Sequence, residues 1–342
     1  MSQTIFITGA SSGIGKATAE RFAERGWNVV ATMRNPDDGA DLAGRADTVV
    51  THLDLLDPDS IGAAIAAAED RFDGIDVLVN NAGNGAYGPL EATPMDVIRR
   101  QLDVNVFGLI ETIQAVLPGM RTRRQGTIVN VSSVGGRATY PFGTPYHGSK
   151  WAVEGLSEAL HYELSALGIR VKIIEPGGVR TDFSGRSFVF TNDPELEDYQ
   201  PLVETFLAAG GSPTGLIEPE DVAEVIWTAT TDGTTQLRYL AGDGARTVLG
   251  QRYSPEQDEA FVHGLRTSSG CRRSLRRRPR QLHLTTDSQY LPMAVDRDDI
   301  AKEPDHRRSS PSGLRRHRRL LFGEGRGRRR RARLERPWWM AS

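Results

Sequence analysis

The sequence predicts an α/β fold in which a parallel sheet of seven strands carries helices on both faces. Short apolar runs of β type alternate with longer segments of helical period, the order typical of βα repeats. Several of these runs are near-continuous in Val and Ile, which indicates strands that are buried on both faces. We therefore predict a doubly wound sheet within a single domain that spans residues 1–265.

Seven apolar runs supply the predicted strands. They lie at residues 4–8, 28–33, 47–53, 76–83, 126–133, 170–176 and 237–242. Helical periodicity fills the intervals between them, for example over residues 15–26 and 60–72. Thr144 and Pro145 are the residue types of a helix N-cap and first helical position, and leucines at helical spacing follow as far as Gly168. This predicts a long helix after the fifth strand.

The composition is that of a globular chain. At 342 residues and 38% hydrophobic content, the chain can bury a substantial core. No apolar run approaches the roughly 18 residues of a membrane helix, and the first residues enter a strand pattern without the features of a signal peptide. Cys271 is the single cysteine, which excludes an intrachain disulfide and suits a reducing compartment. We therefore expect a cytoplasmic protein.

Residues 266–342 are a different kind of sequence. They carry 22 Lys and Arg against 8 Asp and Glu, out of totals of 42 and 44, so residues 1–265 hold 20 basic and 36 acidic residues. High like charge and low hydrophobicity predict a largely disordered tail. Its abrupt onset favours a shifted reading frame or read-through. Binding of nucleic acid or an anionic membrane surface is the alternative, although no groove-reading motif accompanies the arginines.

A phosphate-binding loop is predicted where the first strand runs into the first helix. The stretch TGASSGIG covers residues 8–15. Glycines let the backbone turn tightly and approach a pyrophosphate, and the helix N-terminus offers free N–H groups and the positive end of its dipole. An ordinary glycine-rich turn is the alternative. The predicted dinucleotide contacts in this loop are Thr8, Gly9, Ser11, Ser12, Gly13, Ile14 and Gly15.

The end of the second strand indicates which nicotinamide cofactor is bound. An NAD site usually has Asp or Glu there to bind the ribose 2′-hydroxyl, whereas this chain has Met33 and Arg34. A guanidinium suits a 2′-phosphate through charge-assisted, forked hydrogen bonds, so NADP(H) is favoured over NAD(H). The alternative is that Arg34 is a surface charge of the loop. Asp54 and Leu55, after the third strand, are predicted to flank the adenine ring.

Further motifs follow in the order and spacing of a known family. They are NNAG at 80–83, LDVNVFG at 102–108, VSSVGG at 131–136, YHGSK at 146–150 and PGGVRT at 176–181. With the glycine loop, they make about residues 3–265 resemble a short-chain dehydrogenase/reductase, which has a Rossmann fold. The resemblance implies that the cofactor channel and nicotinamide site include Asn81, Ala82, Gly83, Pro176, Gly177, Val179 and Thr181.

The candidate catalytic residues are Asn105, Ser133, Tyr146 and Lys150. Tyr146 and Lys150 stand one helical turn apart, so their Cβ atoms lie about 5 to 6 Å apart on one face. Lowering the pKa of a phenol from about 10 to about 7 requires roughly 4 kcal/mol, and one ammonium at about 4 to 5 Å supplies nearly that much. We therefore expect Lys150 to lower the pKa of Tyr146.

The resemblance implies a role for each of these residues in carbonyl reduction. Ser133 binds the substrate oxygen while Tyr146 donates a proton to it, and the nicotinamide delivers hydride to the carbon. Lys150 also binds the nicotinamide ribose, and Asn105 positions a water molecule in the proton relay. In reverse, the same residues oxidise an alcohol with Tyr146 as base. No metal site is predicted.

Substrate choice is predicted to reside in residues 183–218. The aromatic residues there could wall an apolar pocket, act as a lid or anchor the loop in the core; they are Phe183, Phe188, Phe190, Tyr199 and Phe206. The stretches 29–36 and 133–150 are similar to the hydroxysteroid and retinol dehydrogenase branch, which implies a hydrophobic ketone, aldehyde or alcohol. The family resemblance also implies a homodimer or homotetramer.

Other functions are less favoured. An NADP-binding redox sensor without turnover would not need Ser133, Tyr146 and Lys150 together. Sugar epimerases share the Tyr and Lys but space their glycines differently. His147 fills a variable position of the family and is predicted to be a packing or surface residue, and Gly148 stands where Ala or Ser is more usual, at a cost of up to roughly 1 kcal/mol.

Overall fold

The computed structural model describes residues 2–45, 47–208, 215–250 and 252. All seven predicted strands form one parallel sheet. Their bounds are Thr4–Thr8 (β1), Asn28–Met33 (β2), Thr48–His52 (β3), Val77–Asn80 (β4), Gly126–Val131 (β6), Ile169–Pro176 (β7) and Arg238–Ala241 (β11). The strand order is β11-β7-β6-β4-β1-β2-β3, so the winding direction reverses between β1 and β4. In sheets of this type, ligands bind at the carboxyl ends of the strands beside such a reversal.

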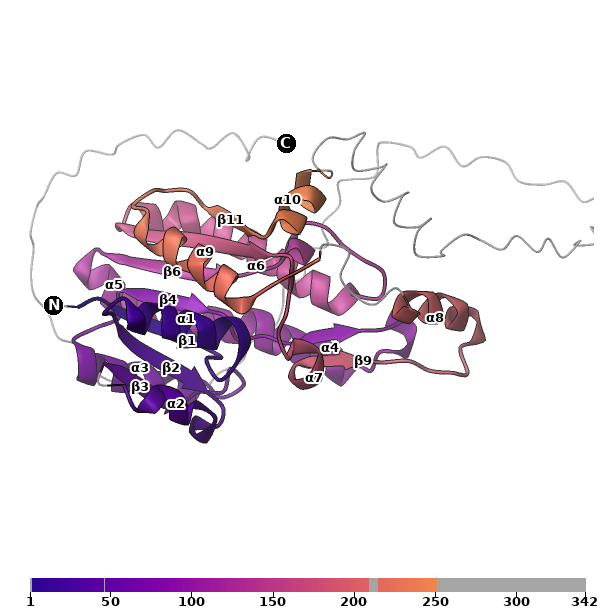
Figure 1. The fold of residues 1–342 in the computed structure, drawn as a ribbon, viewed down its shortest axis with the longest axis horizontal. Helices are drawn as coiled ribbons and strands as arrows, with labels where there is room; N and C mark the ends of the chain where they lie inside the picture. The colour runs from indigo at the N-terminus through magenta and orange to yellow at the C-terminus, as the bar shows by residue number, and fades with distance from the viewer. Residues whose placement is uncertain (1, 46, 209–214, 251, 253–342) are drawn as a thin grey trace, which may run out of the picture. The chain divides into compact units, whose positions relative to one another are not determined.

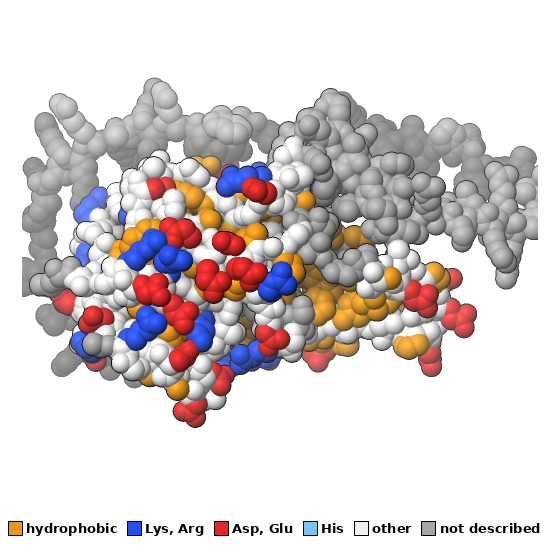
Figure 2. All heavy atoms as spheres, in the orientation of Figure 1, with side chains coloured by type: hydrophobic (Ala, Val, Ile, Leu, Met, Phe, Trp, Pro, Cys, Tyr) orange, Lys and Arg blue, Asp and Glu red, His pale blue; other side chains and the backbone are white. Residues whose placement is uncertain are grey.

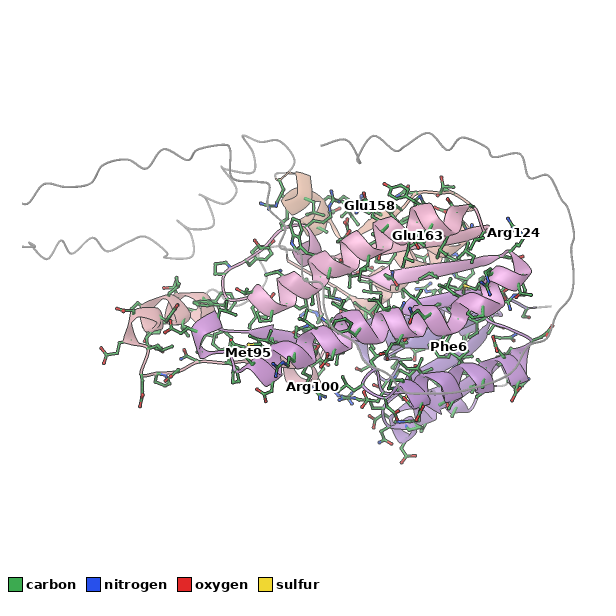
Figure 3. All side chains as sticks on the ribbon, turned by 180° about the vertical axis from the view of Figure 1, so that it is seen from behind. Phe6, Met95, Arg100, Arg124, Glu158 and Glu163 are labelled. Carbon is green, nitrogen blue, oxygen red and sulfur yellow. The ribbon has the colours of Figure 1, made fainter. Side chains whose placement is uncertain are left out.

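Helices cover both faces of the sheet, as predicted (Figure 1). On one face lie α1 (Gly13–Glu24) and α9 (Pro219–Thr231), which contribute Phe22, Val222 and Ile226 to a core with β1, β2 and β4. On the other face lie α3 (Pro58–Phe72), α5 (Gly108–Arg123) and α6 (Thr144–Ser165), seen in front in Figure 3. The strands are therefore buried from both sides, which explains their near-continuous Val and Ile.

Shorter elements complete the described chain. The helical ones are Pro36–Gly39 (η1), Ala40–Ala43 (α2), Leu90–Ala92 (η2), Met95–Leu102 (α4), Asp103–Phe107 (η3, a π-helical turn), Val134–Gly136 (η4), Phe183–Arg186 (α7), Glu197–Tyr199 (η5), Gln200–Ala208 (α8) and Asp243–Gly250 (α10). Two small parallel sheets were not predicted: Gly85–Tyr87 (β5) pairs with Phe188–Phe190 (β9), and Gly178–Val179 (β8) pairs with Leu216–Ile217 (β10). Strands of two or three residues are too short to show a period of two.

Some predicted boundaries were wrong by a few residues. The fourth strand ends at Asn80 instead of residue 83, because the next two backbone N–H groups donate to the Thr8 hydroxyl, at 3.0 and 3.1 Å, instead of extending the ladder. The fifth strand ends at Val131. Helix α6 begins at Thr144, so the N-cap is Gly143, which has no side chain to cap the helix.

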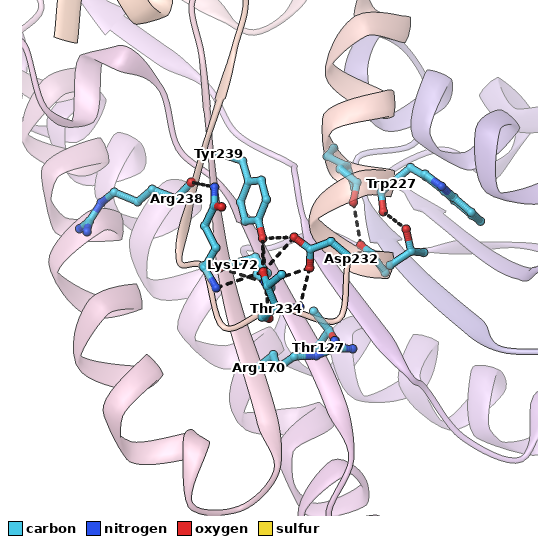
Figure 4. Close-up of polar contacts among 12 residues, drawn as sticks. Thr127, Arg170, Lys172, Trp227, Asp232, Thr234, Arg238 and Tyr239 are labelled. Atoms are coloured by element: carbon cyan, nitrogen blue, oxygen red, sulfur yellow. Dashed lines mark hydrogen bonds and ion pairs between the residues drawn. The ribbon is translucent and has the colours of Figure 1, made fainter. Parts of the chain in front are cut away.

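A buried polar cluster ties β7 to the turn before β11 (Figure 4). The Lys172 ammonium is fully buried and donates to the carbonyls of Thr234 (2.8 Å) and Gln236 (2.9 Å) and to the Tyr239 hydroxyl (2.9 Å). The Asp232 carboxylate lies 3.5 Å from this ammonium. Burial raises the pKa of Asp232, but hydrogen bonds from Tyr239 and Thr234 and the charge of Lys172 outweigh it and lower the pKa to about 2.

Replacing Asp232 with asparagine should lower the free energy of unfolding by about 2 kcal/mol at pH 7, because it leaves a buried ammonium with less compensation. A depressed carboxyl pKa stabilises the fold above the unfolded value of about 3.9, and this contribution is lost as the pH falls toward about 2. Urea unfolding at pH 7 and pH 3 measures both effects. Asp243→Asn, at a fully exposed carboxylate, is the matched control, and equal urea midpoints for the two variants would contradict the prediction.

No helix among the described residues is long and apolar enough to cross a membrane. Cys271 and the predicted tail of residues 266–342 lie outside the described residues, so the predictions made for them stay predictions.

Candidate active site

A cavity of about 600 Å³ opens at the carboxyl ends of the central strands. Most of the predicted site residues line it, from Gly9 in the glycine loop to Tyr146 and Lys150 on α6. The strand-end residues that share it are Arg34 after β2, Asp54 and Leu55 after β3, Asn81, Ala82 and Gly83 after β4, Ser133 after β6, and Pro176, Gly177, Val179 and Thr181 at and after the end of β7. Parallel strands bring these separate sequence motifs to one edge of the sheet.

The backbone of the glycine loop has a conformation and a close packing that leave no space for side chains at Gly9, Gly13 and Gly15. Gly9 and Gly13 have φ of 71° and 54°, a region that favours glycine. A Cβ on Gly9 would stand 2.9 Å from the Ala82 backbone, and one on Gly15 would stand 2.2 Å from the Gly9 carbonyl oxygen. Ser11, Ser12, Gly13 and Ile14 line the cavity where α1 begins, so the positive end of this helix faces into it.

Two predicted loop contacts, Thr8 and Gly15, lie behind the cavity wall and not on it. The Thr8 hydroxyl accepts hydrogen bonds from the backbone of Asn81 and Ala82, at 3.0 and 3.1 Å. The Asn81 amide donates to the Thr8 and Gly9 carbonyls, at 3.0 and 3.1 Å. Thr8 therefore holds the two loops together, and Gly15 lets them approach closely, since a Cβ there would stand 2.2 Å from the Gly9 carbonyl oxygen. Their contact with a dinucleotide stays a prediction.

The Arg34 side chain lies at the β2 end of the cavity and is exposed. Within the described part of the chain, its guanidinium has no hydrogen bond or ion pair. Its carbonyl contacts the His52 ring nitrogen Nδ1 at 2.7 Å, which fixes the backbone at this strand end. Arg186, which lines the same cavity, is paired instead with Asp38 at 3.2 Å. A guanidinium with no partner beside the cavity can bind an anion that enters it.

Ser133 and Tyr146 are brought together at the far end of the cavity. The Ser133 hydroxyl accepts from the Gly135 backbone at 3.0 Å and lies close enough to Tyr146 to influence its pKa. Burial raises the pKa of Tyr146, and the hydrogen bond to Ser133 opposes this shift. Tyr146 is therefore a neutral phenol that can give up a proton to a group placed against it.

Lys150 is buried one turn further along α6, and its ammonium donates to the Val131 carbonyl at 2.9 Å. Burial lowers the pKa of Lys150 to about 8, while the charge of Glu154 opposes the shift. The expectation that Lys150 brings the Tyr146 pKa toward 7 is wrong for this arrangement, because burial of the phenol dominates and the ammonium is directed at a carbonyl. What Lys150 does once a nucleotide lies beside it stays a prediction.

Asn105 lies in the π-helical turn before α5 and does not reach the cavity. Its amide oxygen accepts from the Asn84 backbone at 2.9 Å, and its amide nitrogen donates to the Asn84 carbonyl (2.9 Å) and to the Ser149 hydroxyl (3.1 Å). The amide thus clamps the loop after β4 to α6. Its predicted role in positioning a water molecule stays a prediction.

A wall of aromatic rings surrounds the substrate end of the cavity. Tyr87, Phe183 and Phe188 line it, and the Tyr87 ring centroid is 5.5 Å from that of Tyr146. Phe190 and Phe206 stack in a second layer at 6.0 Å, and the Tyr199 hydroxyl donates to Glu91 at 3.2 Å. Of the predicted aromatic residues, Phe183 and Phe188 therefore line the cavity, whereas Phe190, Phe206 and Tyr199 pack outside it. Residues 209–214 of the predicted substrate segment lie outside the described residues.

The short chain dehydrogenase family model matches residues 3–189, which include the glycine loop and the Ser133, Tyr146 and Lys150 positions. The chain belongs to the short-chain dehydrogenase family. The predicted Rossmann-like fold and family are thus confirmed.

Curated and solved members of the short-chain dehydrogenase family match well beyond the motifs. Estradiol 17-beta-dehydrogenase 1 of Rattus norvegicus is 40% identical over 282 residues, which are 77% of this chain and 80% of that protein. A short-chain dehydrogenase from Streptomyces avermitilis has a TM-score of 0.66 at 31% identity, over 79% of this chain and 97% of the other. A metagenomic short-chain oxidoreductase in complex with NADP has a TM-score of 0.56 at 28% identity, over 70% and 96%.

In this short-chain dehydrogenase, several cavity residues carry no motif signal and were not predicted. Tyr87 is in β5, Arg100 is in α4, and Arg186 ends α7. Tyr87 could have been predicted from its position, because it lies four residues after the NNAG motif, whose residues also line the cavity. Arg100 could not have been found, because sequence spacing does not bring α4 to the cavity. Arg186 lies within the predicted substrate segment, residues 183–218, but no motif singles it out.

His147 confirms its predicted packing role. The ring is buried, and its Nε2 accepts from the Tyr140 backbone at 3.1 Å. Its Nδ1 must therefore carry the proton and donate to the Gly135 carbonyl at 3.0 Å. The neutral imidazole joins the loop after Ser133 to α6, and burial lowers the pKa of His147, so the ring stays neutral at physiological pH.

Proposed function

We propose that the protein is an NADP(H)-dependent oxidoreductase that interconverts a ketone or aldehyde and an alcohol. One observation supports the proposal most: a single cavity joins the glycine loop and the exposed Arg34 at one end to the Ser133 and Tyr146 side chains at the other. A dinucleotide laid along this cavity would present its phosphates to the loop and its nicotinamide to the hydroxyl pair.

The residues present fit NADP(H). Gly9 and Gly15 let the glycine loop pack tightly against the loop after β4, and the N-terminus of α1 would face the pyrophosphate. Arg34 would bind the 2′-phosphate, with Asp54 and Leu55 beside the adenine. At the other end, the predicted nicotinamide contacts are Asn81, Ala82, Gly83, Pro176, Gly177, Val179 and Thr181. The NADP complex of a metagenomic relative supports this choice over NAD.

In the direction of reduction, the bound nicotinamide supplies the hydride. The Ser133 hydroxyl orients the substrate oxygen by a hydrogen bond, and Tyr146 donates its phenolic proton to that oxygen as it gains electrons. The raised pKa of Tyr146 keeps the phenol protonated until then. We propose that Lys150, one turn away and also on the cavity wall, binds the nicotinamide ribose. In the direction of oxidation, the phenolate takes the proton back from the alcohol.

We propose a hydrophobic substrate. The cavity wall beside Tyr146 is aromatic, with Tyr87, Phe183 and Phe188, and hydrophobic side chains remain exposed nearby on β9 and α8, where Val189 and Leu207 are 49% and 58% exposed. Figure 2 shows hydrophobic side chains over this part of the molecule. The name of the rat relative, an estradiol dehydrogenase, supports a bulky apolar alcohol or ketone.

The cofactor proposal is tested by fluorescence titration of the full chain with NADPH and with NADH. We expect saturable binding of both, with NADPH at least about tenfold tighter because the 2′-phosphate gains charge-assisted bonds to Arg34. Equal affinity for the two nucleotides would contradict the NADP preference, and no binding of either to the folded chain would overturn the function.

We also propose an oligomeric state and a cellular compartment for the protein. A homodimer or homotetramer through α5 and α6 is supported by exposed Phe107, Trp151 and Tyr162 at 55%, 45% and 67% on or beside these helices. A cytoplasmic location rests on the single cysteine.

A further inference from the structure

A buried ionic cluster lies directly behind the proposed catalytic residues. Glu154 follows Lys150 by one turn of α6, and Glu175 is the penultimate residue of β7, just before the cavity residues Pro176 and Gly177. Glu154 is 5% exposed and Glu175 is fully buried. Two carboxylates are costly to bury without compensation, so their partners decide what they do.

Two arginines compensate the carboxylates incompletely. Arg238 on β11 donates to Glu154 at 2.9 Å and lies 3.6 Å from Glu175, and it also pairs with Glu158 at 2.6 Å. Arg137, in the loop after Ser133, donates to Glu175 at 3.1 and 3.3 Å. Glu158 projects from α6 near the surface, as Figure 3 shows. Its side chain is 42% exposed, against 6% for Glu154.

One oxygen of Glu154 is buried near the Ser132 side chain. Within the described part of the chain, Glu154 Oε1 and the Ser132 hydroxyl are both buried and make no hydrogen bond. Both side chains lie over Gly136: a Cβ there would be 2.5 Å from the Ser132 hydroxyl and 3.0 Å from Glu154 Cγ. Glu154 therefore places a buried carboxylate one helical turn from Lys150, and a buried charge acts over several ångströms.

We propose that Glu154 is a positioning residue for the proposed reaction, because its buried carboxylate holds Lys150 in the ammonium form. The effect of Glu154 on Lys150 does not depend on the proposed oxidoreductase function; only its effect on turnover rests on that function. The charged groups that face Glu154 are Lys150 and Glu158 on α6, Glu175 on β7, Arg238 on β11 and Arg137 in the loop after Ser133.

The directions of the pKa shifts agree with this role. Burial lowers the pKa of Lys150 to about 8 against the opposing charge of Glu154. Burial, followed by the charge of Glu154, raises the pKa of Glu175 to about 7. Without the Glu154 charge, the pKa of Lys150 would fall further, and the ammonium would be lost at a lower pH.

The chain permits a direct test, because its lysines are few: Lys16, Lys150, Lys172 and Lys302. The full chain is labelled with ¹³C-lysine and its side-chain carbon signals are followed by NMR as the pH is raised. The Lys150 signal is assigned by its loss in Lys150→Arg. Glu154→Gln should move the Lys150 titration down by about one pH unit. Glu158→Gln, which also removes a carboxylate from Arg238, is the matched control and should leave the Lys150 titration unchanged.

An unchanged Lys150 titration in Glu154→Gln, or an equal shift in Glu158→Gln, would overturn the proposal. Where the glutamine variant does not fold, Glu154→Met carries the same prediction, since an apolar residue of similar volume often replaces a buried ion well. The NMR result needs no substrate, so it stands apart from a failure of the proposed function. If turnover is found, its alkaline limb should shift with Lys150, and a Lys150 shift without that movement would overturn the link to the reaction.

Discussion

Replacing Tyr146 with phenylalanine should lower the rate of carbonyl reduction by about 10³-fold, within the range for loss of a general acid. The variant keeps the ring and removes only the hydroxyl close to Ser133. Binding of NADPH should change by less than about threefold, because the nucleotide contacts lie elsewhere in the cavity. Stopped-flow measurement of NADPH oxidation, with a parallel fluorescence titration, separates the two effects.

Tyr87→Phe is the matched control for this loss. Tyr87 presents a second phenol to the same cavity, with its ring 5.5 Å from that of Tyr146. Burial and the nearby Tyr146 raise the pKa of Tyr87, and we assign Tyr87 to the cavity wall and not to proton transfer. Its replacement should cost less than about tenfold in rate. Similar losses in the two variants would mean that Tyr146 acts through packing and not as a proton donor.

The second large effect concerns the cofactor preference. Arg34→Ala should weaken NADPH binding by about 10- to 100-fold, the range expected for loss of a hydrogen bond between two charged groups. Binding of NADH, which lacks the 2′-phosphate, should stay within about twofold. The measurement is a titration of wild-type and variant chains with both nucleotides at one ionic strength, since salt screens exposed charges.

Arg186→Ala distinguishes this specific contact from the general charge of the cavity. Arg186 lines the same cavity and is also a guanidinium, but it is already paired with Asp38 at 3.2 Å. We expect a much smaller loss of NADPH affinity than in Arg34→Ala. If both nucleotides weaken equally in Arg34→Ala, then Arg34 is a general surface charge, as the alternative interpretation of the sequence holds.

The fold could be predicted because its signal is local and repeated. Six of the seven strands, all except β11, are short runs rich in Val and Ile, and they alternate with segments of helical period. The glycine loop and the residues after β4, β6 and β7 could be placed in one site for a related reason, since parallel strands end at one edge of the sheet. These predictions needed no knowledge of side-chain contacts.

Contacts between distant parts of the chain could not be predicted. The sequence gives no sign that Arg238 bonds to Glu154 across 84 positions, or that the Lys150 ammonium turns to the Val131 carbonyl. The predicted effect of Lys150 on Tyr146 failed for this reason. It used the spacing of the two residues correctly but did not include the burial of the phenol, which depends on β5, α7 and β9.

The measurement that tests the central claim most directly follows the hydride itself. The full chain is incubated with NADPH carrying deuterium at the nicotinamide C4 and with a panel of hydrophobic ketones and aldehydes, and the products are examined by mass spectrometry. The account predicts an alcohol with one deuterium on the former carbonyl carbon, formed by the wild-type chain and not by Tyr146→Phe. Tight NADPH binding without any labelled alcohol would contradict it and would favour a redox sensor instead.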